Sequence, residues 1–160
     1  MKAVIAVDSI FGNTRLVGEA LKEELEKAGT EVEFVNLRTD FRVPSDGDLL
    51  LIGSPTRVAK MTGRSKKFVR KLDTKAWSGK TVVTFDTHMP LPDDPDERKK
   101  KMKWIEPGAA GKLSDLVAKR GLKVHSPPLR CRVSDMKGPL MPGELDRARE
   151  YARQLLASVH

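Results

Sequence analysis

The sequence predicts an α/β protein built on a doubly wound parallel sheet, and two observations lead to this fold class. Short apolar runs alternate along the chain with longer segments whose apolar residues recur at helical spacing. The apolar runs show little polar alternation, which is typical of strands buried on both faces. Strands that alternate with helices form a parallel sheet with helices on both faces. We expect residues 1–160 to form a single domain.

Five strands are expected in order along the chain. The runs at 2–7, 48–53 and 81–85 are continuously apolar and predict buried central strands. Residues 31–37 alternate between the two sides and predict an edge strand. A further strand is expected near residues 122–126.

Helices are expected between these strands and after the last one. They are predicted at residues 13–29, 62–72, 110–121 and 143–159. In the first, apolar residues recur at helical spacing from Leu16 to Ala28, and Gly29 ends the helix. Ligands of such sheets bind outside the carboxyl ends of the strands. The loops after residues 7, 53 and 85 are therefore the candidate site.

Composition limits the classes of function. Hydrophobic residues make up 39% and charged residues 32% of the chain, as in globular proteins. No apolar run is long enough for a membrane span and no signal peptide is evident, so we expect a cytoplasmic protein. Cys131 is the single cysteine, which excludes an internal disulfide. Three scattered histidines and one cysteine give no metal-binding pattern.

The chain is basic, with a net charge of +8. This charge has two interpretations: an acidic partner, or an ordinary surface with excess lysine. Nucleic acid is disfavoured because aromatic residues, which stack on bases, are only 5% of the chain. Association into a homo-oligomer is left open.

The first loop is unusually polar for a turn after a buried strand. Its sequence, "SIFGNT", comprises Ser9, Ile10, Phe11, Gly12, Asn13 and Thr14. A helix N-terminus offers free N–H groups to an anion, and the loop adds hydroxyl and amide donors. The alternative is a plain helix cap formed by Ser9 or Asn13.

Two motifs resemble a known family. "DSIFGNT" resembles the phosphate-binding loop of flavodoxins. "GSPTR" and the later "WSGK" resemble segments of the WrbA-type NAD(P)H:quinone oxidoreductases, a branch of the same superfamily. The resemblance implies a flavodoxin-like fold with strand order 2-1-3-4-5 and one bound FMN. It implies electron transfer between redox protein partners, which the basic charge suggests are acidic.

The resemblance also implies which residues contact FMN. The first loop would hold the phosphate. The second loop would line the flavin with Pro55, Thr56, Arg57 and Val58, and the third would approach its pyrimidine side with Asp86, Thr87, His88 and Met89. The alternatives place Arg57 in solvent and His88 on an ordinary surface. Trp77 precedes a strand and is expected to pack in the core rather than stack on the flavin.

The charged segment 93–106 has two interpretations. It is either a solvated flexible loop, or a docking surface or flavin lid with Met102 or Trp104 over the ring. No catalytic residue is assigned. Two other functions stay open beside the electron carrier: an NAD(P)H-dependent FMN oxidoreductase acting on quinones, and a cofactor-free interaction module on the same fold.

Overall fold

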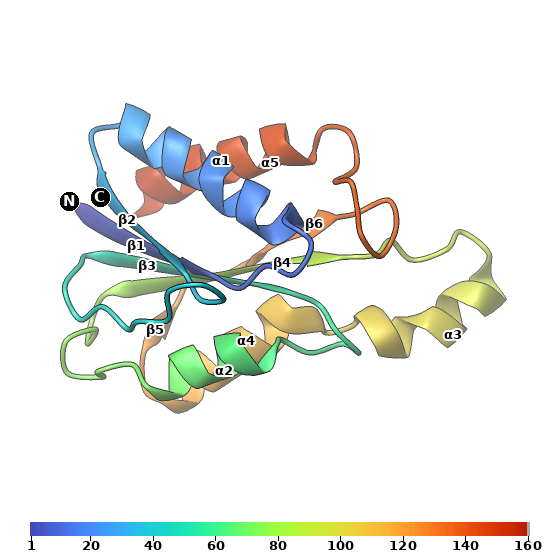
Figure 1. Ribbon diagram of the computed structural model, residues 1–160, viewed down its shortest axis with the longest axis horizontal. Coiled ribbons are helices and arrows are strands. Elements are labelled where there is room, and N and C mark those ends of the chain that lie inside the picture. Colours follow the sequence, from blue (N-terminus) through green and yellow to red (C-terminus); the bar gives the residue numbers. More distant parts are fainter. Residues whose placement is uncertain (160) are drawn as a thin grey trace.

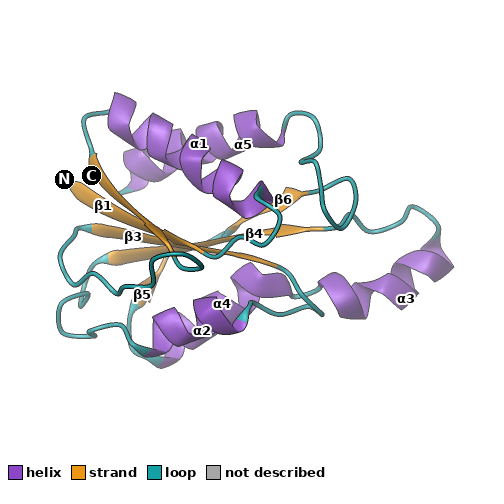
Figure 2. Cartoon of the chain, viewed as in Figure 1, coloured by secondary structure: helices purple, strands orange, loops and turns teal. Residues whose placement is uncertain are grey.

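A twisted parallel sheet with strand order β2-β1-β3-β4-β5 runs through the centre of the molecule, as Figures 1 and 2 show. The computed structural model describes residues 1–159, so only His160 of the predicted 1–160 domain lies outside the described residues. The strands are β1 (Lys2–Val7), β2 (Glu31–Asn36), β3 (Leu49–Pro55), β4 (Thr81–His88), β5 (Lys123–Val124) and β6 (Leu129–Arg132). The doubly wound α/β fold and the strand order predicted from the sequence are confirmed.

The outer edge of the sheet differs from the prediction of one strand near residues 122–126. Two short strands lie there, β5 beside the start of β4 and β6 beside its end. The break falls at Pro127 and Pro128, which have no N–H to donate to a sheet ladder. The edge therefore continues to Arg132 and supports β4 along most of its length.

Helices cover both faces of the sheet. Helices α1 (Asn13–Lys27) and α5 (Glu144–Ser158) pack together on one face. Helices α2 (Gly63–Arg70) and α4 (Gly108–Lys119) cover the other. Each layer buries an apolar cluster against the sheet, which is the main stabilising contribution to such a fold. Trp77 belongs to the second cluster and is fully buried, so its predicted packing role is confirmed.

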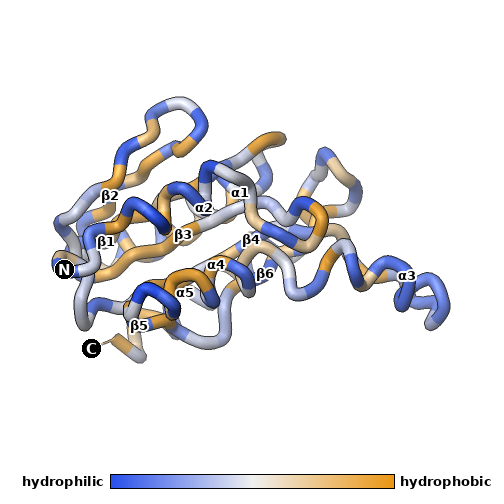
Figure 3. The backbone as a smooth tube through the Cα atoms, turned by 90° about the horizontal axis from the view of Figure 1, so that it is seen from below, coloured by the Kyte–Doolittle hydropathy of each residue, from blue (hydrophilic) through white to orange (hydrophobic). Residues whose placement is uncertain are grey.

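The segment 93–106 is a helix rather than the flexible loop that its charge suggested. Helix α3 (Pro95–Ile105) projects from the body in Figure 1 and is mostly hydrophilic in Figure 3. Asp94 caps it by accepting a hydrogen bond from the Glu97 N–H at 3.0 Å. Acidic residues lie in its first turn and Lys103 in its last, which suits the helix dipole. Its residues 95–104 are exposed, and Ile105 is buried.

None of the helices within residues 1–159 is both long enough and apolar enough to cross a membrane.

Candidate functional site

A cavity of about 500 Å³ lies where the chain leaves the carboxyl ends of β1, β3 and β4. The end of α3 and the loop before α5 complete its walls. The lining residues are Ser9, Ile10, Phe11, Asn13, Thr14, Pro55, Thr56, Arg57, Val58, Thr87, His88, Met89, Pro90, Pro92, Lys101, Trp104, Ile105, Val133 and Met136. The fold therefore brings together the three loops that the sequence indicated.

The predicted site residues line this cavity with two exceptions, Gly12 and Asp86. Strand β3 extends through Pro55 and β4 through His88, further than the sequence suggested. Asp86, Thr87 and His88 thus lie in the last part of a strand rather than in a loop. Thr87 and His88 still reach the cavity because they end the strand.

The N-terminus of α1 gives one wall of the cavity polar groups. The Ser9 hydroxyl oxygen accepts hydrogen bonds from the N–H groups of Gly12 and Arg15, at 3.1 and 3.3 Å. Ser9 thus caps the helix, yet its own hydroxyl hydrogen can still be donated. Within residues 1–159, the N–H groups of Asn13 and Thr14 have no protein acceptor. Two free donors at the positive end of a 15-residue helix suit an anion.

Asn13 also ties the loop before α5 to the first loop. Its side-chain Nδ2 donates to the Lys137 carbonyl at 3.1 Å. Gly138 has a φ of +97°, and a Cβ atom there would lie 2.5 Å from Asn13 Oδ1, so the close approach needs glycine. The amide donor predicted to face an anion is therefore used within the chain. This contact brings Met136 to the cavity.

Other walls of the cavity are apolar. Phe11, Val58, Met89, Trp104 and Met136 line it with partly exposed side chains, 41–64% accessible. Ile105 and Val133 form buried parts of the wall. Apolar walls with a few convergent polar groups are typical of sites for flat organic ligands.

A strained turn after β3 connects this wall to α3. Val58 and Ala59 have φ values of 50° and 60°, in the left-handed region that a β-branched residue rarely adopts. The backbones of Arg57 and Lys60 hold the turn by exchanging hydrogen bonds of 2.8 and 3.0 Å. The Ala59 N–H donates to the Trp104 carbonyl at 2.8 Å. This bond fixes the end of α3 beside the turn, and strain of this kind gathers at ligand sites.

The charges at the cavity are positive. Arg57 and Lys101 line it, and none of its lining residues is acidic. His88 also lines it, with Nδ1 2.8 Å from the Met89 carbonyl oxygen. Burial lowers the pKa of His88 below its ordinary value, although the nearby Asp86 carboxylate opposes this shift. We conclude that the imidazole is neutral at pH 7.

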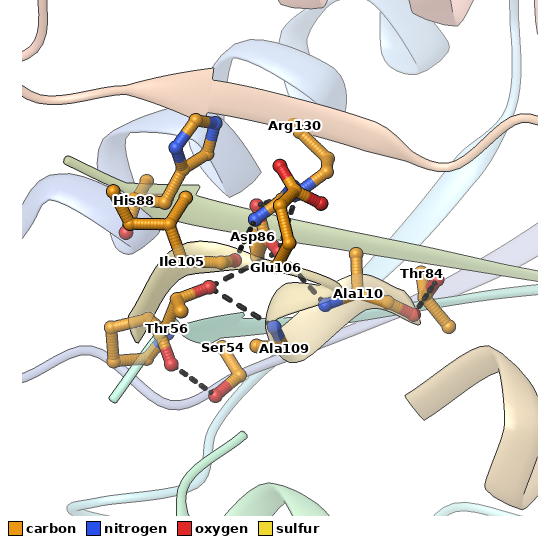
Figure 4. A network of polar contacts seen from close by, with 12 residues as sticks. Ser54, Thr56, Thr84, Asp86, His88, Ile105, Glu106, Ala109, Ala110 and Arg130 are labelled. Atoms are coloured by element: carbon orange, nitrogen blue, oxygen red, sulfur yellow. Dashed lines mark hydrogen bonds and ion pairs between the residues drawn. The ribbon is translucent and has the colours of Figure 1, made fainter. Parts of the chain in front are cut away.

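Asp86 turns away from the cavity into a buried polar network, which Figure 4 shows. Arg130 Nε donates to both of its carboxylate oxygens, at 3.1 and 3.0 Å. The Ala110 N–H and the Thr56 hydroxyl donate to Oδ2, at 2.9 and 3.2 Å. Burial raises the pKa of Asp86 above its ordinary value, and Arg130 opposes that shift. Asp86, which was predicted to approach the flavin, therefore does not line the cavity.

Arg130 extends the same network to the base of α3. It donates to the Ile105 carbonyl at 3.0 Å and pairs with Glu106 at 2.8 Å. Figure 4 shows these groups gathered around one guanidinium. Asp86 therefore helps to position the helix end that carries Trp104, without lining the cavity itself.

Sequence reasoning missed part of the lining. Pro90, Pro92, Lys101, Ile105, Val133 and Met136 were not anticipated. Of the two residues considered for a lid, Trp104 lines the cavity and Met102 does not. The apolar pair Trp104–Ile105 after a run of lysines was the one signal that the segment returns to the body. Nothing in the local sequence marks Val133 or Met136.

Comparison with known proteins found no matching family model and no matching curated protein. Solved structures do match. A flavodoxin from the domain Archaea superimposes with a TM-score of 0.75 at 19% identity, covering 99% of both chains. The chain has the flavodoxin-like fold. Oxidised flavodoxin 1 from Bacillus cereus also superimposes on this flavodoxin-like chain. Its TM-score is 0.73 at 13% identity, and the match covers 98% of both chains.

A WrbA-like flavodoxin from Agrobacterium tumefaciens is also similar to the flavodoxin-like chain. Its TM-score is 0.67 at 17% identity, with 99% of this chain and 96% of that chain covered. Both branches that the sequence motifs resembled are therefore found among the structural neighbours.

Proposed function

We propose that the chain binds one FMN in the cavity and carries electrons between redox proteins. The observation that carries this proposal is the mixed lining of the cavity. The lining combines free N–H groups at the N-terminus of α1 with apolar walls. FMN has matching parts, a phosphate and a flat ring system. The bound flavin would supply the redox chemistry.

The residues present fit this cofactor in charge and in size. The N–H groups of Asn13 and Thr14, with the hydroxyls of Ser9 and Thr14, would hold the phosphate. Phe11, Val58, Met89, Trp104 and Met136 would enclose the ring. The volume of about 500 Å³ lies within the range of roughly 300–1,000 Å³ for small-molecule sites.

The charge around the cavity supports a redox role. Reduction adds negative charge to a flavin, and the lining offers Arg57 and Lys101 with no carboxylate among its residues. These cations would stabilise the reduced cofactor relative to the oxidised one. Asp86 is buried and its carboxylate is paired with Arg130, so it does not oppose this effect.

A second candidate function is NAD(P)H-dependent reduction of quinones by the bound FMN. The "GSPTR" turn and the similarity to a WrbA-like structure favour it. Whether the protein is a carrier or an oxidoreductase, we propose that the chain forms one domain and acts in the cytoplasm.

Two measurements test these proposals. The purified protein is titrated with FMN and with riboflavin while flavin fluorescence is followed; we expect FMN to bind more tightly because only FMN has the phosphate. No binding of either flavin would favour a cofactor-free interaction module. The FMN-loaded protein is then mixed with NAD(P)H and a quinone. Slow oxidation of NAD(P)H supports the carrier, whereas rapid turnover supports the oxidoreductase.

A further inference from the structure

Exposed apolar side chains gather at the mouth of the cavity. The apolar rim consists of Ile10, Phe11, Val58, Met89, Trp104 and Met136, which are 37–64% exposed. Across residues 1–159, the other large apolar residues with comparable exposure are Met1, Leu16 and Met102. Contiguous exposed apolar residues with a polar surround are typical of interaction sites.

Exposed cations lie beside this apolar rim. The cationic ring consists of Arg57, Lys60, Lys101, Lys103 and Lys137, all exposed. Lys103 Nζ lies 5.3 Å from the Trp104 ring centre, and Lys137 Nζ lies 5.9 Å from that of Phe11. In the described part of the chain, no ion pair involves any of these five side chains. Their charge is therefore available to a partner.

Few acidic residues lie near the mouth. Glu106 pairs with Arg130 at 2.8 Å. Asp135 is exposed beside Met136 and keeps its charge. The acidic residues of the 93–106 segment lie mainly at its start, toward the projecting tip of α3 in Figure 1. The basic end of α3 is the end that lies against the body.

Helix α3 presents basic residues on two sides. Lys101, Trp104 and Ile105 line the cavity. Lys99, Lys100 and Lys103 form, with Asp96, a shallow groove on another side of the helix. The Ala59–Trp104 and Arg130–Ile105 hydrogen bonds hold the base of α3. A fixed projecting helix beside the cavity can thus contact a protein that covers the mouth.

We infer that the apolar rim, the cationic ring and the basic end of α3 form a docking surface for an acidic redox protein. This inference rests on the proposed electron-carrier function, because such a partner would approach the cofactor at the cavity mouth. Protein interfaces combine an apolar centre with a charged periphery, as this surface does. Charges of opposite sign would steer the partner and increase its association rate.

Protein suits this surface better than nucleic acid does. Four of the six rim residues, Ile10, Val58, Met89 and Met136, are not aromatic and cannot act as stacking platforms for bases. Interfaces with nucleic acid are more polar and more strongly charged than protein interfaces. The apolar centre of the rim would be buried by the apolar centre of a protein.

The test measures equilibrium binding of an oxidised acidic [2Fe–2S] ferredoxin to the FMN-loaded protein by calorimetry at low ionic strength. A basic c-type cytochrome serves as the opposite probe. The double variant Lys101→Gln/Lys103→Gln removes two charges from the cationic ring. The matched control, Lys119→Gln/Lys123→Gln, removes two exposed charges near the start of β4, at the other end of the sheet. A third variant, Met136→Ser, reduces the apolar rim without changing charge.

We expect ferredoxin, but not the cytochrome, to bind, and its affinity to fall with added salt. The ring variant should weaken binding roughly tenfold, and the control less than twofold. Met136→Ser should weaken binding severalfold with an unchanged salt dependence. Equal losses in the ring and control variants, or no ferredoxin binding, would overturn the inference. The inference would also be overturned if a single-stranded oligonucleotide bound more tightly than ferredoxin and the ring variant abolished that binding.

The two proposals fail in distinguishable ways. The ferredoxin titration is repeated on protein without added flavin, because the ring and α3 belong to the chain itself. Ferredoxin binding without any FMN binding would remove the carrier function and keep the docking surface. FMN binding without ferredoxin binding would keep the cofactor site and remove the docking surface.

Discussion

The hydroxyl oxygens of Thr14 and Thr87 lie 2.8 Å apart, joining the start of α1 to the end of β4. The two residues are 73 positions apart in the chain, and both are buried. One hydroxyl hydrogen is used between them, so the pair can still donate one to a ligand. This contact brings the first loop and the end of β4 together at the cavity.

Thr14→Ala should weaken FMN binding about tenfold or more. A hydrogen bond to a charged group contributes roughly 1.5–3 kcal/mol, and the variant removes one from the proposed phosphate site. Riboflavin, which has no phosphate, should lose little affinity. Fluorescence titrations with both flavins measure the effect, and equal losses for the two would show that Thr14 does not contact the phosphate.

Arg57→Gln should lower the reduction potential of the bound flavin by tens of millivolts. The guanidinium lines the cavity, and its charge favours the reduced, more negative cofactor. A net effect of ~1.4 kcal/mol corresponds to about 59 mV for one electron. A potentiometric titration measures the change, with Lys119→Gln as a control distant from the cavity. An unchanged potential would place Arg57 in solvent.

Iodide should quench Trp104 but not Trp77. Trp104 is 48% exposed and has Lys103 near its ring, whereas Trp77 is fully buried. The nearby positive charge should make iodide a better quencher than caesium. Bound FMN should protect Trp104 from iodide. Trp104→Phe should remove the quenchable emission; quenching that persists in this variant would contradict the placement of the two tryptophans.

Gly138→Ala should lower the free energy of unfolding by roughly 1–3 kcal/mol. A methyl group there overlaps the Asn13 side chain, and φ is +97°. The loop that carries Met136 would have to move away from Asn13. Urea denaturation measures the loss, and Gly79→Ala, also at positive φ but without a close neighbour, separates backbone strain from overlap. Equal losses in both variants would rule out the overlap.

Stability should fall as the pH falls from about 5 toward 2, partly through Glu144. Burial raises the pKa of Glu144, but hydrogen bonds from Arg147 and Arg132 outweigh burial and lower the pKa to about 2. The pKa of Glu144 is lower in the folded chain than in the unfolded chain, so the ionised carboxylate stabilises the fold at pH values above the unfolded pKa. This stabilisation is lost as the pH falls toward the folded-state pKa. We expect Glu144 to contribute roughly 2 kcal/mol to the free energy of unfolding. This is less than the full pKa shift would give, because both arginines are half exposed and water screens their charges.

Glu144→Gln should therefore flatten the acid side of the stability profile. Urea denaturation at several pH values measures this, with Glu150→Gln on the exposed face of α5 as the control. A profile of Glu144→Gln parallel to that of the unaltered chain would show that Glu144 does not set the acid dependence.

The fold class and the edge of the sheet that carries the site can be recognised from the sequence alone. Buried strands have continuous apolar runs, and helices have apolar residues at helical spacing, so both can be recognised locally. Parallel strands all end at one edge, which places the segments around Ser9, Arg57 and Thr87 together. The polar first loop is also a local feature, because its residues adjoin both the strand and the helix.

The remaining walls of the cavity depend on contacts that form only when the chain folds. The orientation of Asp86 follows from its place inside β4 and from Arg130, which comes from a strand 44 residues later. Trp104 reaches the cavity because Ala59 and Arg130 hold the end of α3, and Met136 because Asn13 holds its loop. These contacts join residues far apart in the chain. No local pattern encodes them, because each depends on the positions of both partners after the sheet has formed.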